Sequence, residues 1–189
     1  MTLGKMRFLA IMLMLALPAQ AQECFSGKPK HVAYSDGHAI TIIQRYGDDL
    51  TYTMPYAGDH DAVLESQMML FPKHERFAGR SVEHKWPGRL PKSSALKPGY
   101  HFDLNGTMKS GSGAAVPYRN EGDVLRQEVV SVGACSYDVV VIAMNTYINN
   151  ELAITATNYL SLDMLVLLRS DFVPISASSG ASWTAVAIE

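Results

Sequence analysis

Short apolar runs, most of them alternating with polar residues, recur along the chain and predict β-strands almost throughout. In the first half of the chain they cover residues 39–46 (AITIIQRY), 50–54 (LTYTM), 63–71 and 76–84. Gly47-Asp48-Asp49 between the first two runs is typical of a hairpin turn, and Pro72-Lys73 separates the last two. A helical turn near 59–67 is a weak alternative to a strand there. Because strand-like runs are joined by short turns, the first half predicts an antiparallel meander.

The second half of the chain continues this pattern after a Pro- and Gly-rich stretch at 86–99, which breaks regular structure. Asn105-Gly106 predicts a hairpin turn after a strand at 101–104, and 109–115 predicts a flexible loop. Further strands are expected at 124–132, 137–144, 152–160 and 164–172. We therefore expect a mostly β protein, a single antiparallel curved sheet or half-barrel with few helices, formed by residues 22–175. Residues 176–189 are expected to be a C-terminal tail.

Residues 1–21 have the layout of a secretory signal peptide. Lys5 and Arg7 form a basic start, residues 8–17 are apolar, and Pro18 precedes a small-x-small sequence at 19–21 that signal peptidase cuts after. The apolar run is shorter than the roughly 20 residues of a membrane-spanning helix. The expectation is a secreted, periplasmic protein that starts at Gln22 and has no transmembrane segment in its mature chain.

The mature chain is acidic, which argues against nucleic acid as a partner. Loss of Lys5 and Arg7 leaves 14 Lys and Arg against 18 Asp and Glu in 168 residues, a length sufficient for one domain with its own core. A basic stretch between Lys73 and Lys97 is interrupted by Pro and Gly. It is interpreted as a solvated surface, with binding of an acidic partner as the alternative.

Cys24 and Cys135 are the two cysteines of the chain, and in an oxidising compartment they predict a disulfide. Lipidation of Cys24 is disfavoured because a lipobox requires a small residue directly before the cysteine, where Glu23 stands. A reactive or metal-bound thiol is the remaining alternative.

Neither a metal site nor a cofactor is predicted with any strength. The densest group of potential ligands is Asp59, His60 and Asp61, but on a strand the two carboxylates face one way and His60 the other. Because the group follows Gly58, a solvated acidic turn is the better interpretation.

The sequence also offers no catalytic residues. Ser112 lies in Gly111-Ser112-Gly113, which lacks the full Gly-x-Ser-x-Gly pattern and its strand–turn–helix context, so a linker is favoured. Cys135 is a nucleophile only if it is unpaired. No Gly-rich loop precedes a Lys-Ser or Lys-Thr pair to bind phosphate.

Residues 86–172 resemble a layout found in secreted bacterial β-proteins of unknown function. The matching pieces are Trp86-Pro87, Leu96 to Gly99, Val124 to Ala134 with Glu128, Tyr137-Asp138 to Ile142, and Tyr159 to Arg169. The chain departs from the layout at Cys135, where a turn residue such as Thr is usual, and at Asn158-Tyr159, where a tryptophan-tyrosine pair is usual. The resemblance implies a half-barrel similar in shape to the periplasmic lipoprotein carrier, and it implies no catalytic residues.

Two apolar runs without alternation, at 68–71 (MMLF) and 164–168 (MLVLL), predict burial on both faces. They are either ordinary core or the lining of an apolar cavity, for which methionine is well suited. Together with the half-barrel they support a non-enzymatic envelope protein that binds an apolar ligand, such as a lipid or lipoprotein, or an envelope protein partner. A hydrolase-type enzyme with an unrecognised site and a structural protein without a ligand are the alternatives.

Overall fold

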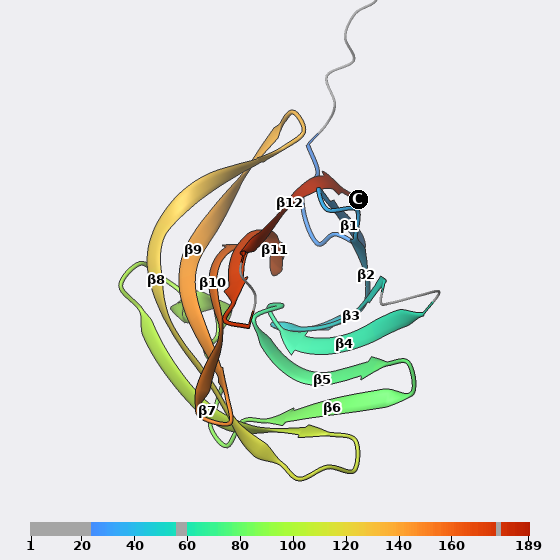
Figure 1. Cartoon of the computed structure of the whole chain (residues 1–189). Coiled ribbons are helices and arrows are strands. Elements are labelled where there is room, and N and C mark those ends of the chain that lie inside the picture. Colours follow the sequence, from blue (N-terminus) through green and yellow to red (C-terminus); the bar gives the residue numbers. More distant parts are fainter. Residues whose placement is uncertain (1–23, 56–59, 177–178) are drawn as a thin grey trace, which may run out of the picture.

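The computed structural model describes residues 24–55, 60–176 and 179–189, and its regular structure is nearly all β (Figure 1). One turn of 3-10 helix, Ser93–Ala95, interrupts the strands. The strands are β1 (His31–Tyr34), β2 (Ala39–Tyr46), β3 (Asp49–Pro55), β4 (Asp61–Gln67), β5 (Phe71–Phe77), β6 (Arg80–Lys85), β7 (His101–Ser110), β8 (Val116–Val132), β9 (Cys135–Ile148), β10 (Glu151–Ser161), β11 (Val166–Pro174) and β12 (Ala181–Ile188).

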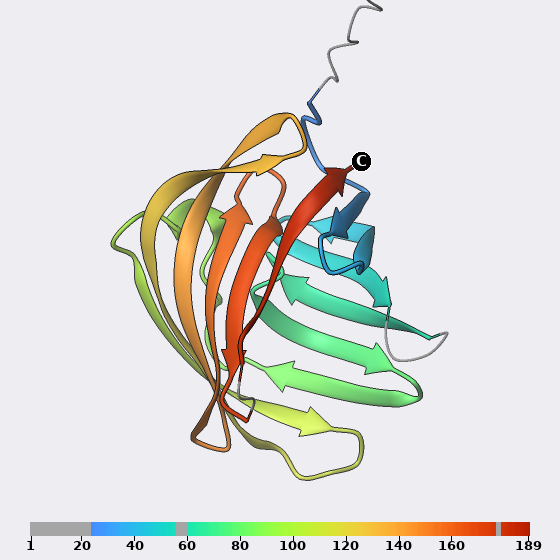
Figure 2. The same ribbon diagram turned by 45° about the horizontal axis from the view of Figure 1, so that its top comes forward.

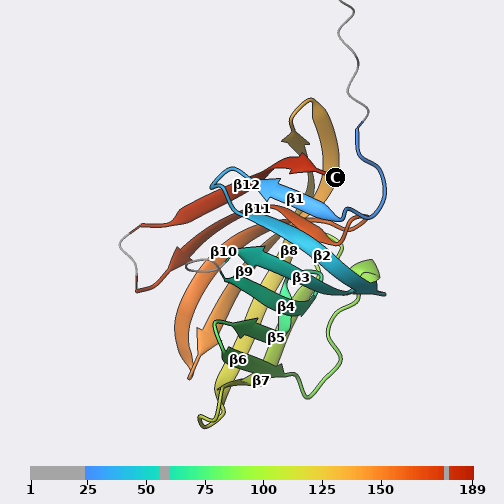
Figure 3. The same cartoon turned by 90° about the vertical axis from the view of Figure 1, so that its right-hand side faces the viewer.

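The sheet closes into a twelve-stranded antiparallel barrel, which corrects the expected open half-barrel. Each strand pairs with its neighbours in the sequence, and β1 lies between β2 and β12 (Figure 3). The closing strand β12 falls within residues 176–189, which the sequence predicts as a tail. Its sequence, ASWTAVAI, is rich in small residues and gives a weak strand signal, yet Ala185 is buried where it pairs with Tyr34 of β1.

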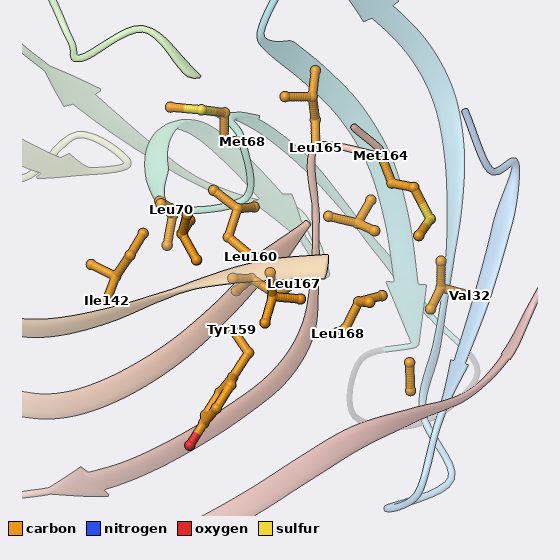
Figure 4. Packing of buried hydrophobic residues seen from close by; sticks show 14 of the residues in the cluster. Val32, Met68, Leu70, Ile142, Tyr159, Leu160, Met164, Leu165, Leu167 and Leu168 are labelled. Atoms are coloured by element: carbon orange, nitrogen blue, oxygen red, sulfur yellow. The ribbon is translucent and has the colours of Figure 1, made fainter. Parts of the chain in front are cut away.

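The two continuous apolar runs, at 68–71 and 164–168, do not form strands along their whole length, because each contains a buried turn. Met68 and Met69 adopt positive φ angles of 54° and 57° between β4 and β5, and Leu165 has a φ of 59° between β10 and β11. This left-handed backbone is unfavourable for residues with side chains, and burial of those side chains compensates for it. Both turns fold inward at the same end of the barrel and fill it (Figure 4).

The predicted hairpin turn at Asn105-Gly106 is also wrong, because β7 runs straight through both residues. Gly106 is required there for space: a Cβ atom would lie 2.5 Å from the carbonyl oxygen of Lys85 and 3.0 Å from the Trp86 ring. Gly122 in β8 meets the same kind of constraint from the Phe102 ring, 2.5 Å from an added Cβ. The glycines therefore mark close packing inside the barrel wall.

The barrel has one packed end and one open end. At the packed end, Val32, Met68, Leu160 and Leu168 have almost no exposed surface and lie near Met164 and Leu165 (Figure 4). The hairpin between β8 and β9 extends beyond this end and lies beside the first described residues (Figure 2). There the disulfide joins Cys24 to Cys135, as expected.

Candidate functional site inside the barrel

Strand register shows which side chains face the interior. On β7 the odd-numbered residues from His101 to Lys109 are exposed, while Phe102, Leu104, Gly106 and Met108 are buried or half-buried. Paired residues of antiparallel strands place their side chains on the same face. Following the pairs around the ring extends this inward face to the other strands.

At the open end this inward face is apolar and only partly buried. Its half-buried members are Met54, Leu64, Leu104, Met144, Ile154, Phe172 and Trp183. Because these side chains face inward and still keep exposed surface, the interior at this end is reached by solvent. An apolar group that entered this end of the barrel would contact these half-buried side chains.

A buried polar cluster lies within this inward face. His84 Nε2 is 2.9 Å from Glu75 Oε1, with 3% of the histidine side chain and 28% of the glutamate side chain exposed. The Tyr118 ring contacts His84 edge-on with 4.6 Å between centroids, and it also contacts Trp86 edge-on with 5.4 Å between centroids. Glu75 is therefore the member of the pair through which the cluster meets the solvent in the barrel.

Two tyrosine hydroxyls complete the cluster. Burial raises the pKa of Tyr118 to about 12, and the neighbouring Asn120 and Thr146 side chains partly oppose that rise. Burial also raises the pKa of Tyr52 to about 12, with Ser66 opposing the rise and Glu75 adding to it. Both phenols therefore stay neutral at ordinary pH and act as hydrogen-bonding groups.

Several buried polar atoms of this interior have no hydrogen bond of normal geometry within the described part of the chain. They are His84 Nδ1, Asn120 Nδ2, Ser66 Oγ and, on the far wall, Asn158 Nδ2. The oxygens of the two asparagines accept from Thr146 and Ser170, at 2.9 and 2.8 Å, so their amino groups are left over. Burying polar atoms without hydrogen-bond partners lowers the stability of the fold. A bound ligand or an ordered water would supply the missing hydrogen bonds.

Basic side chains do not join this cluster. Arg45 shares the inward face at the packed end, where it donates to the carbonyl oxygens of Met164 and Pro29 at 2.8 and 2.7 Å. Arg80 lies exposed at the tip of the β5–β6 hairpin. On the outside, Arg119 holds Asp103 in a two-pronged ion pair with bonds of 2.7 and 2.9 Å. Arg119 and Asp103 thus form an ion pair on the outer surface, while the interior cluster combines Glu75 and His84 with the hydroxyls of Tyr52 and Tyr118.

A groove lies in the barrel wall at the point where the pairing of β6 with β7 ends. This groove has a volume of about 700 Å³ and is lined by Lys85, Trp86, Pro87 and residues 105–107. Trp86 is fixed there by a 2.8 Å hydrogen bond from its Nε1 to the carbonyl oxygen of Pro72. Through Trp86 and Tyr118, the groove adjoins the interior cluster.

The residues singled out from the sequence do not form this site. Asp59 lies outside the described residues, and His60 and Asp61 are exposed at the start of β4. Among the described residues, no group of three or more His, Cys, Asp or Glu side chains is placed to hold a metal ion. Ser112 is exposed in the turn after β7, which agrees with its interpretation as a linker.

Sequence reasoning missed Glu75 and His84. No motif or spacing in the sequence singles them out. The usable signal was alternation: Glu75 and Phe77 on β5, and Val82 and His84 on β6, occupy one face of a hairpin. Recognising that this face is the inside of a barrel requires the closure of the sheet, which the local pattern does not contain.

Comparisons with known proteins support the fold. No family model matches the chain, and no curated protein sequence does. The crystal structure of the hypothetical lipoprotein YmcC from Escherichia coli (K12) is similar, with a TM-score of 0.53 and 10% sequence identity. The likeness covers 86% of this chain and 89% of that one. In the described ranges, no helix has the length and apolar character needed to cross a membrane.

Proposed function

We propose that this chain is a non-enzymatic, secreted periplasmic protein that binds an apolar or amphipathic ligand, such as a lipid or the lipid part of a lipoprotein, in the open half of its barrel. The observation that carries the proposal is the half-buried apolar lining of the open end, together with the unpartnered buried atoms His84 Nδ1 and Asn158 Nδ2 on the same inward face. Apolar walls with a few placed polar groups are the usual composition of a ligand site. The disulfide and the likeness to a hypothetical lipoprotein support a location outside the cytoplasm.

The Glu75–His84 pair has the arrangement of a base and its orienting acid, which is one part of a hydrolase site. Within the described residues, however, His84 Nδ1 has no hydrogen-bond partner, and so no serine or cysteine is placed against it. A binding role therefore accounts for the cluster more simply than catalysis does.

The test is titration of the oxidised protein with N-phenyl-1-naphthylamine, a neutral apolar dye whose fluorescence rises in an apolar environment. Ile154→Glu places a carboxylate in the apolar lining and is expected to weaken dye binding at least tenfold. The matched control is Val186→Glu, on an outward position that is 52% exposed, and it is expected to leave binding unchanged.

Circular dichroism and thermal melts establish that both variants are folded before binding is compared. The proposal is wrong if the wild-type protein does not bind the dye. It is equally wrong if the Ile154 and Val186 variants bind the dye as well as the wild type.

A further inference from the structure

The wall of the barrel contains a stretch of sheet edge without a partner. β6 and β7 pair over four positions, from Val82↔Ser110 to Lys85↔Thr107. β7 pairs with β8 much further, back to His101↔Asp123. Residues 101–105 of β7 therefore have a strand on one side only, and their backbone on the other side is here called the open edge.

The register identifies the backbone groups that point out of the open edge. The hydrogen bond from Gly111 N to Ser81 O shows that odd-numbered positions of β7 bond toward β6. The bond from Val124 N to Tyr100 O shows that even-numbered positions bond toward β8. The N–H and C=O groups of Asp103 and Asn105 thus point away from β8, and no backbone partner faces them among the described residues.

The open edge meets the 700 Å³ groove at Asn105. Asn105 and the two residues after it form one wall, and Trp86 and Pro87 form the other. The Trp86 ring approaches β7 closely because Gly106 has no side chain. An extended chain added to the open edge would therefore find backbone partners on one side and an apolar wall on the other, which is the composition of sites that bind by strand addition.

The loop that leads from β6 to β7 begins at the groove with Trp86 and Pro87, and it is basic. Arg89, Lys92 and Lys97 are exposed on it, and none of them forms an ion pair in the described part of the chain. The acidic side chain nearest to the open edge, Asp103, is already paired with Arg119, which lowers the pKa of that carboxyl. The loop that starts at the groove and leads to the open edge thus carries positive charge on a protein that is acidic overall.

We propose that the open edge of β7 binds an extended acidic segment of a partner protein as an added strand. Backbone bonds to Asp103 and Asn105 hold the segment, Trp86 and Pro87 contact its apolar side chains, and the basic loop attracts its carboxylates. This interaction does not depend on a ligand inside the barrel, since the edge and the groove belong to the wall.

The first test is amide hydrogen exchange of the oxidised protein followed by NMR. In the free protein the Asp103 and Asn105 amides are expected to exchange at least a hundredfold faster than the Leu104 amide, which bonds to β8. Equal protection of the three amides in the free protein overturns the proposal, because the edge is then already covered.

The second test adds a seven-residue peptide of alternating glutamate and valine. It is expected to slow exchange at Asp103 and Asn105, and a version N-methylated at alternate residues is expected to lose binding, since it cannot donate to the edge. Arg89→Glu combined with Lys92→Glu is expected to weaken binding at least tenfold, and Lys28→Glu, on an exposed residue outside the loop, less than twofold. The proposal is overturned if one millimolar peptide leaves both amides unchanged, if the N-methylated peptide binds equally, or if the loop variant binds like the control.

Discussion

Removal of the Cys24–Cys135 disulfide is expected to lower the free energy of unfolding by about 5 kcal/mol. The bond joins residues separated by 111 positions, so it constrains most of the unfolded chain from before β1 to the start of β9. Applying the chain-entropy relation to a loop of this length at room temperature gives that figure of about 5 kcal/mol. A typical domain has a total stability of only about 5–15 kcal/mol, so the loss would be a large fraction of it.

The assay is urea unfolding, followed by tryptophan fluorescence and circular dichroism, of the oxidised protein and of the Cys24→Ser, Cys135→Ser double variant. The double variant is preferred to reduction because it leaves no thiols to reoxidise. A smaller slope of free energy against urea for the oxidised protein would show that its unfolded state is the more compact one, as the argument requires. A difference below about 1 kcal/mol would refute the reasoning, since the loop closure would then contribute little to stability.

Three further changes test the packing and the buried phenol. Gly122→Val is expected to cost about 2 kcal/mol or more, because the new side chain overlaps a phenylalanine ring, whereas Gly88→Ala, with open space around it, should be nearly neutral in the same urea assay. Leu168→Ala should cost about 3 kcal/mol by leaving a cavity, and Val173→Ala, at a position that is 46% exposed, less than about 0.5 kcal/mol. Because the pKa of Tyr118 is raised to about 12, the folded chain retains a proton that the unfolded chain releases above about pH 10, so stability should fall between these values. Tyr118→Phe should flatten that fall in melts measured across this range, and an unchanged profile would contradict the assignment.

Local sequence patterns predicted the strands well and their ends less well. The alternating run at 39–46 corresponds to β2, and the apolar run at 137–144 lies within β9. The apolar run at 63–71 predicts one strand, but it contains a buried turn at Met68 and Met69. Composition does not distinguish the two, because a turn folded into a core and a strand buried on both faces need the same side chains.

The interior site was beyond local prediction for a different reason. Asn120 and Thr146 are hydrogen-bonded partners, and Glu75 and His84 are another pair, yet each pair is joined only by the pairing of strands. Whether such residues face water or the interior depends on whether the sheet closes. Closure in turn depends on β1 and β12, whose short or small-residue sequences carry little signal.

The closure of the barrel also has a consequence for the order of folding. β1 is the shortest strand, and it completes the ring by pairing residues such as Val32 and Ile188, which lie near opposite ends of the chain. Contacts so distant in sequence form slowly, since the intervening chain must be ordered first. We therefore expect the β1–β12 meander to form before its two outermost strands pair, as an intermediate with two unpaired edges. During that interval the chain is most exposed to edge-to-edge aggregation, because both outermost strands present unpaired backbone groups.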